Sequence, residues 1–228
     1  MGLGAAPIKN LLQLIESKGA KVYSAGGPLQ AIDAFSFRHR ATPVIFLNVH
    51  KSAERLRFDL AHELGRLVMH GGSLHVEPGK EKKQAANDFA SAFLMPRADV
   101  LGSIRGNLML EDILVLKRRW RVSAMALNLR AHRLGVISNW TYSTLARQLS
   151  GAGFRRGEPG SDLLAESSSL PTQVMTDMRS QGKSFIDIAR ALDVRGQDVR
   201  DLMLGLVTFA LEGEAQLRTP SRANLRVV

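Results

Sequence analysis

The 228-residue sequence predicts an α+β protein in which a small sheet and a long amphipathic helix are followed by mostly helical units. The runs at 20–25 and 43–49 are short, rich in β-branched or aromatic residues and flanked by glycine or proline, as strands are. Between residues 52 and 70, apolar positions recur at helical spacing. After residue 96 the remaining periodic segments are all helical, which places the sheet in the N-terminal part.

Three helices are predicted around this sheet. The first covers residues 7–18, starts with a proline and ends before a glycine. The second covers 52–70, with a single apolar stripe that stops at Gly71. The third covers 82–95 and ends at Pro96, because proline disfavours helical geometry in the residue before it.

The rest of the chain is expected to form smaller units. Short amphipathic segments at 109–119, 123–134 and 139–149 predict a compact, basic unit with a helix-turn-helix-like plan. Residues 151–170 are rich in glycine and serine without periodicity, which is typical of a linker or a loose wrap. The expected division is a domain at 1–108, the basic unit at 109–150, a linker at 151–170, a helix-turn-helix-like unit at 171–212 and a basic tail at 213–228.

Composition and charge narrow the class of protein. The chain has no cysteine, which excludes disulfides and thiolate metal sites, and no apolar run of membrane-spanning length, so we expect a cytoplasmic protein. The formal charge of +10 is uneven, because residues 109–150 carry 7 Lys/Arg against 2 Asp/Glu whereas residues 151–228 carry 10 of each. A phosphate-binding surface needs such a local excess, although many basic proteins never bind DNA.

One motif in the central helix carries metal chemistry. H-E-L-G-R begins at His62 and matches the first four places of H-E-x-x-H. In that motif two imidazoles four residues apart share a helix face and bind one Zn²⁺, while the glutamate activates the bound water. The fifth place holds Arg66, whose guanidinium stays protonated and offers no lone pair. His70 does not replace it, because it lies roughly 12 Å from His62 along the helix axis.

Two longer segments, R-x-R-F-D-L-A-H-E-L-G and A-N-D-F-A-S-A-F-L-M-P, resemble the ImmA/IrrE family of bacterial metallo-endopeptidases. The resemblance extends to PVIFLN, LKRRWRVSAMALNLRAHRLG and GFRRGEP, and it covers roughly residues 4–210. It implies a zincin-like N-terminal domain. Members of the family are generally zinc endopeptidases that cut or relieve a helix-turn-helix repressor and so control mobile elements, prophages or stress responses.

The resemblance also assigns the site residues. It makes His62 the first zinc ligand and Glu63 the general base, with Arg66 at the second ligand place. The third ligand is the acid of E-x-x-A-N, and Lys83 stands there, three residues before Ala86. Two cations at ligand places predict a lost metal site, so no cofactor is expected. We also expect Arg66 and Lys83 to supply the positive charge of zinc by pairing with Glu63.

A second interpretation is that the chain retains the zinc-dependent peptidase activity. In it, His62 binds zinc together with Glu81, Glu77 or His75 after a local rearrangement, and the chain remains an active endopeptidase that cleaves a helix-turn-helix repressor. Zinc would then be the cofactor.

Residues 110–134 have the length and turn of a DNA-binding helix-turn-helix. The other interpretation is a structural helical unit with a solvated basic face. The candidates for DNA contact are Lys117, Arg118, Arg119, Arg121, Ser123, Asn128, Arg130 and Arg133.

The apolar pattern of residues 174–204 suits a second helix-turn-helix, but Asp198 and Asp201 lie on the helix that would read DNA. Dimerisation or partner docking is the favoured role for this unit. The sequence thus predicts a regulatory pseudopeptidase that binds a protein partner, such as a helix-turn-helix repressor, with DNA as a second partner. A third hypothesis is a DNA-binding transcription regulator that uses the peptidase fold as a scaffold.

Overall fold

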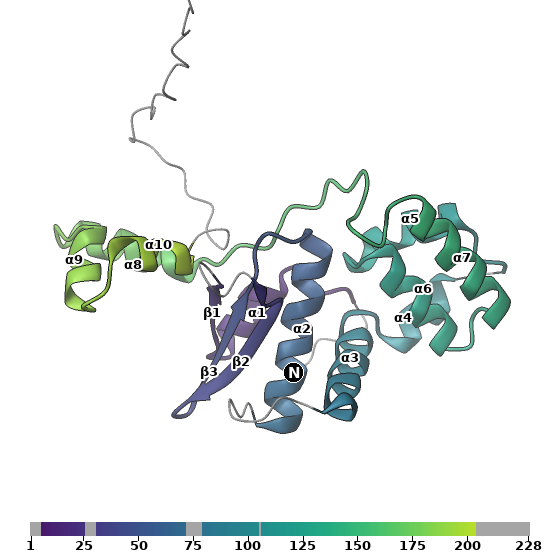
Figure 1. Ribbon diagram of the computed structural model, residues 1–228, viewed down its shortest axis with the longest axis horizontal. Helices are drawn as coiled ribbons and strands as arrows, with labels where there is room; N and C mark the ends of the chain where they lie inside the picture. The colour runs from purple at the N-terminus through teal and green to yellow at the C-terminus, as the bar shows by residue number, and fades with distance from the viewer. Residues whose placement is uncertain (1–5, 26–30, 72–78, 105, 204–228) are drawn as a thin grey trace, which may run out of the picture.

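The computed structural model describes residues 6–25, 31–71, 79–104 and 106–203. Figure 1 shows an N-terminal sheet beside two long helices, a cluster of helices on one side and a smaller helical unit on the other. The α+β class and the zincin-like plan followed by helices are confirmed. Among the described residues, no helix is long and apolar enough to cross a membrane.

The sheet has three strands, β1 (Lys21–Ser24), β2 (Ala34–His39) and β3 (Thr42–Leu47), in the order β1-β3-β2. β1 runs parallel to β3, and β2 runs antiparallel to it. β1 and β3 are the two strands predicted from the sequence, whereas β2 was not predicted. Its signal was the alternation of aromatic and polar residues in A-F-S-F-R-H, and Phe35 of β2 stacks on Phe46 of β3 with ring centroids 4.8 Å apart.

The helices around the sheet are α1 (Leu11–Ser17), α2 (Ala53–His70) and α3 (Lys80–Leu94). They agree with the predicted helices within a few residues at each end. α2 ends where Gly71 takes the left-handed conformation, with φ of 71°. A short helix, α4 (Arg97–Ser103), follows directly after Pro96 and was not predicted.

Gly65 lets α2 and α3 approach each other closely. A Cβ atom at this position would lie 2.7 Å from Cδ1 of Phe89 on α3, which is shorter than real Cβ contacts. The glycine of H-E-L-G is therefore also needed for packing. It lets α3 lie against the face of α2 that carries the motif.

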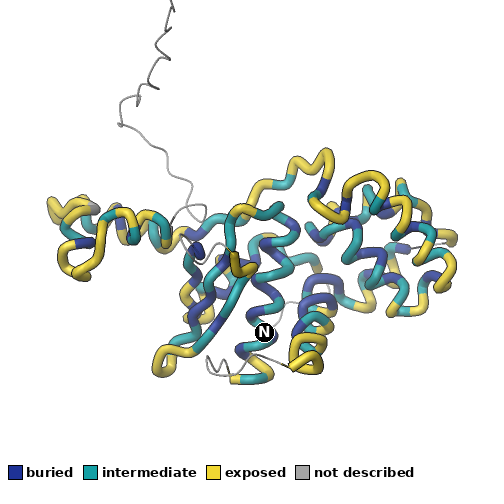
Figure 2. The backbone as a smooth tube through the Cα atoms, viewed as in Figure 1, coloured by how far each residue is buried: buried dark blue, intermediate teal, exposed yellow. Residues whose placement is uncertain are grey.

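The predicted basic unit consists of α5 (Leu110–Trp120), α6 (Ala124–Arg133) and α7 (Asn139–Gly151). The hydroxyl of Ser123 caps α6, accepting from the amide of Ala126 at 3.1 Å, as the sequence indicated. Figure 2 shows buried residues continuing from the sheet region into these helices. The side chain of Trp120 is fully buried there, so this unit shares the main hydrophobic core.

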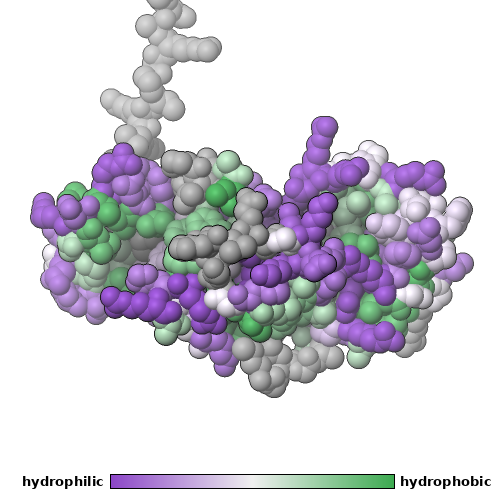
Figure 3. Space-filling view, turned by 60° about the horizontal axis from the view of Figure 1, so that its bottom comes forward, coloured by the Kyte–Doolittle hydropathy of each residue, from purple (hydrophilic) through white to green (hydrophobic). Residues whose placement is uncertain are grey.

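The last described helices are α8 (Leu170–Ser180), α9 (Phe185–Ala191) and α10 (Gly196–Met203). Figure 3 shows hydrophobic surface at the end of the molecule where Figure 1 places this unit. Its exposed apolar side chains include Val174, Ile186, Leu192, Val194 and Leu202. The predicted basic tail at 213–228 lies outside the described residues.

The segment between α7 and α8 has no regular helix over most of its length, but an ion pair and hydrogen bonds join it to the N-terminal elements. Glu166 pairs with Arg57 of α2 and accepts a hydrogen bond from the amide of Leu12 at 2.8 Å. Arg57, whose side chain is 1% exposed, also donates to the carbonyl of Ile8 at 2.5 Å. The segment therefore fastens α1 to α2.

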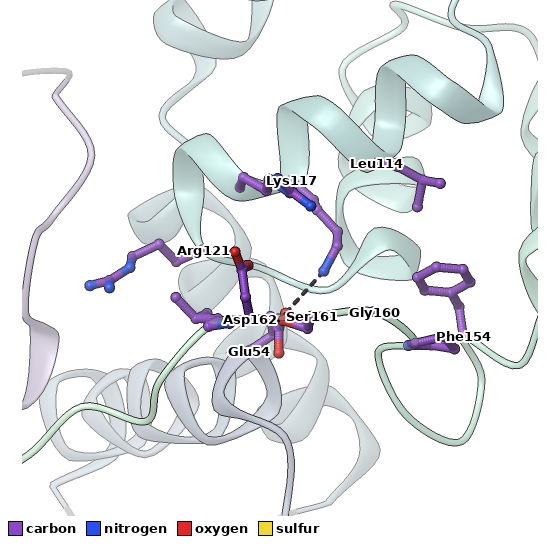
Figure 4. A pocket seen from close by; sticks show the side chains of 11 residues that line it. Glu54, Leu114, Lys117, Arg121, Phe154, Gly160, Ser161 and Asp162 are labelled. Atoms are coloured by element: carbon purple, nitrogen blue, oxygen red, sulfur yellow. Dashed lines mark hydrogen bonds and ion pairs between the residues drawn. The ribbon is translucent and has the colours of Figure 1, made fainter.

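A second attachment is a buried ion triad. Nζ of Lys117 on α5 lies 2.9 Å from carboxylate oxygens of both Glu54 on α2 and Glu158. Their side chains are 7%, 2% and 1% exposed, respectively. Ser161 donates a further hydrogen bond to Glu54 at 2.5 Å. Figure 4 shows Lys117 reaching from its helix toward Glu54 and Ser161.

The two carboxylates of the triad differ in their pKa. Burial raises the pKa of Glu158, although Lys117 opposes the rise. Burial acts in the same direction on Glu54, but the hydrogen bonds from Ser161 and Lys117 outweigh it and lower the pKa of Glu54. The fold therefore stabilises the charged form of Glu54 and disfavours the charged form of Glu158.

We accordingly expect Glu54→Gln to lower the free energy of unfolding at neutral pH more than Glu158→Gln does. Because the pKa of Glu54 is lowered, its stabilisation is fully present above the ordinary glutamate pKa and is lost as the pH falls through the lowered value. The gap between Glu54→Gln and the natural chain should thus close in acid. Urea unfolding from neutral pH down to acid pH measures this, and equal losses for both variants at neutral pH would contradict it.

Candidate functional site

A cavity of about 230 Å³ lies where β2, α2 and α3 meet. It is bounded by both ligand places of the motif on α2, by the third ligand place on α3 and by the start of β2. The polar and charged lining residues are Asp33, Asp59, His62, Glu63, Arg66, Lys83 and Asn87. The structure therefore brings His62, Glu63, Arg66 and Lys83 together in one pocket, as the resemblance implied.

His62 is held by α3. Its Nδ1 lies 2.9 Å from Oδ1 of Asn87, and because an amide oxygen only accepts, Nδ1 carries the proton in this arrangement. The lone pair is then on Nε2, which is how a zinc-binding histidine is oriented by a second residue. The first ligand place of the motif thus holds a histidine that a second residue orients.

Glu63 already has a cationic partner. Its side chain is 4% exposed, Nη1 of Arg66 lies 3.1 Å from Oε2, and the hydroxyl of Ser36 on β2 donates to the same oxygen at 2.6 Å. The carboxylate of Glu63 is therefore occupied by two groups of this chain. The expected pairing of Arg66 with Glu63 is confirmed.

Lys83 behaves differently from Arg66. It lines the same cavity and is exposed, but it forms no ion pair with any residue that the structure describes. The expected pairing of Lys83 with Glu63 is not found.

Two further acids in the pocket were not predicted from the sequence. Asp59 and Asp33 both bind Nζ of Lys51, each at 2.6 Å. Burial raises the pKa of Asp59, and the Lys51 ammonium only partly opposes this. Asp59 could have been found, since it precedes His62 by one helical turn and so shares its face. Ser36 could not be placed without β2.

The donor set does not fit zinc. A catalytic zinc needs three neutral or anionic ligands with free lone pairs, and two of the three places hold Arg66 and Lys83. Within the described ranges, no group of three His, Cys, Asp or Glu side chains is arranged to hold a metal. Of the alternative ligands, Glu81 is exposed on α3, and Glu77 and His75 lie outside the described residues.

The candidates for DNA contact are placed by the helices of the basic unit. Lys117 and Asn128 are buried; the first forms the ion triad, and the second donates to the carbonyl of Tyr142 at 3.1 Å. Both are structural in this fold and do not face solvent. Ser123 caps α6.

The arginines of this unit mostly bond within the chain. Arg121 donates to the carbonyl of Lys9 at 2.5 Å, and Arg130 donates to that of Met95 at 3.1 Å. Arg119 pairs with Asp99 at 2.6 Å, Arg133 pairs with Asp88, and Arg118 is exposed on α5. Much of the basic density predicted for phosphates is therefore used to join helices.

Comparison with known proteins agrees with the geometry of the N-terminal domain. A family model described as the IrrE N-terminal-like domain (Peptidase_M78) matches residues 15–132, just over half of the 228 residues. No curated protein matches the chain. The matched range includes the sheet, α2 with its H-E-L-G sequence, and α3 with Asn87 behind His62. The chain therefore belongs to the ImmA/IrrE family of zincin-like peptidase domains.

Proposed function

We propose that this chain is a regulatory pseudopeptidase, which binds a partner protein in its peptidase-like cleft without cutting it. The observation that carries the proposal is the ion pair between Arg66 and Glu63. A residue at the second ligand place occupies the carboxylate that would serve as general base. A single side chain thus replaces a metal ligand and pairs with the carboxylate of the expected base.

The rest of the cleft supports binding without catalysis. His62 keeps its support from Asn87, Glu63 keeps a hydrogen bond from Ser36, and the cavity stays open. Since the fold and the pocket are present while two ligand places hold cations, a binding role fits better than a purely structural one. By family analogy, the partner is a helix-turn-helix repressor, and the role is control of a mobile element or a stress response.

Zinc content tests this proposal directly. Protein purified without chelator is expected to contain less than about one-tenth of a zinc ion per chain, because two of three ligand places are cationic. It should also leave a candidate repressor intact at stoichiometric concentrations. The Arg66→His, Lys83→Glu double variant serves as the positive control for metal loading. Stoichiometric zinc in the natural chain would instead support the active enzyme with altered ligands.

DNA binding is the second candidate function, and it is favoured by the charge of residues 109–150 and by exposed Arg118 on α5. If phosphates contact this face, affinity for duplex DNA falls steeply as salt is raised. Charge reversal at Arg118 and Arg119 should then abolish binding at low salt. An unchanged affinity in that variant would end this hypothesis.

A further inference from the structure

The cleft presents several unused hydrogen-bond donors at its α2–α3 end. Lys83 has no ion pair with the described residues, and the amide nitrogen of Asn87 donates to none of them. Arg66 uses only Nη1 toward Glu63, which leaves its other N–H groups. Arginine, lysine and amide nitrogens are donors without a competing acceptor atom, so this end of the pocket suits an acceptor.

The acids of the same cavity already contact cations of this chain. Asp33 and Asp59 share Lys51, with both distances at 2.6 Å, and Glu63 is held by Arg66 and Ser36. Lys51 balances one of the two aspartate charges, and Arg66 balances the charge of Glu63. Lys83 is the cation of the lining that has no ion-pair partner among the described residues.

We propose that the cleft recognises an acidic group of its partner, with Lys83, Asn87 and Arg66 as the donors; this inference rests on the pseudopeptidase function proposed above. Where zinc ligands would present lone pairs to a cation, Arg66 and Lys83 present N–H donors. The cavity of about 230 Å³ is large enough for a carboxyl-bearing side chain and too small for a folded element. A hydrogen bond to a charged group typically contributes ~1.5–3 kcal/mol, which is roughly 10- to 100-fold in affinity.

The test is an NMR titration of the full chain with small probes. N-acetyl-glutamate N-methylamide supplies a side-chain carboxylate, and N-acetyl-alanine supplies a chain-end carboxylate. N-acetyl-glutamine N-methylamide is the neutral control of the same shape. Saturable shifts are expected for amides around Lys83 and Asn87 with at least one of the two carboxylates, and the tighter of the two identifies which kind of acidic group the cleft takes.

Two matched variants localise the binding. Lys83→Gln should lower the affinity for the carboxylate probe at least about 10-fold, because it removes the unpaired charge. Lys82→Gln removes the same charge from an exposed neighbour on α3 that does not line the cavity, and it should change the affinity less than about twofold. Equal binding of the neutral probe, no saturable shift with either carboxylate, or equal affinity in Lys83→Gln would overturn the inference. Zinc content is measured separately, so a failure here leaves the pseudopeptidase proposal standing.

Discussion

Lys117→Met is expected to lower the free energy of unfolding by about 3–5 kcal/mol at neutral pH, because it removes the cation between two buried carboxylates. Glu54 and Glu158 have side chains that are 2% and 1% exposed, and each has one carboxylate oxygen without any partner already. Without Lys117, two like charges would remain close together, away from water. Methionine is unbranched and keeps most of the length of the lysine side chain, so the loss mainly reports the missing charge.

Urea unfolding of the full chain measures this effect, with Arg118→Met as the matched control. Arg118 is the next residue on α5 and is exposed, so its replacement should change stability by no more than about 0.5 kcal/mol. Adding Glu54→Gln and Glu158→Gln to Lys117→Met should recover much of the loss, since neutral amides no longer need a cation. A Lys117→Met protein as stable as the control would show that the triad contributes nothing.

The triad also explains how the helical unit is joined to the peptidase-like domain. Lys117 belongs to α5, Glu54 to α2, and Glu158 to the segment after α7. From the sequence, Lys117 was interpreted as a DNA contact because it stands in a run of basic residues. Only the packing of three distant segments shows that this lysine is internal, and no local pattern distinguishes it from exposed Arg118.

The fold was largely predictable because its signals are local. The stripe of α2, its stop at Gly71 and the caps of α6 and α7 depend on residues within a few positions of each other. β2 was missed because its polar residues, including Ser36, made it less apolar than its neighbours. The roles of Glu158 and Glu166 were missed because a segment rich in glycine and serine gives no periodicity, although it is held by distant ion pairs.

The residues of the candidate site could be predicted where they belong to a motif, but their contacts with one another could not. The resemblance, through H-E-L-G-R and the family's E-x-x-A-N, implied that His62, Glu63, Arg66 and Lys83 share one pocket, and the structure has them there. Which of the two cations would pair with Glu63 depended on distances across α2 and α3. Arg66 does so from one turn away on the same helix, whereas Lys83 would have to reach across the pocket.

The Arg66→His, Lys83→Glu variant is expected to bind about one zinc ion per chain. The introduced imidazole would lie one turn after His62 on the same helix face, and the introduced carboxylate would line the same cavity from α3, which supplies the three ligands of a catalytic zinc site. Asn87 already orients His62 through Nδ1, so its Nε2 is ready to bind metal. Metal analysis after gel filtration measures the stoichiometry, with Arg66→His, Lys82→Glu as the control that places the new acid outside the cavity.

Zinc should raise the free energy of unfolding of the Arg66→His, Lys83→Glu variant and leave that of the Arg66→His, Lys82→Glu control unchanged. Without metal, the variant should be less stable than the natural chain, because Glu63 loses Arg66 and the pocket gains a negative charge in place of Lys83. Zinc at ~100 times its dissociation constant should restore about 2.7 kcal/mol, and a chelator should remove it. If the variant loads zinc, two substitutions separate the natural chain from a zinc-binding protein. If it stays metal-free while folded, the cleft differs from a zinc site in more than the residues at the ligand places.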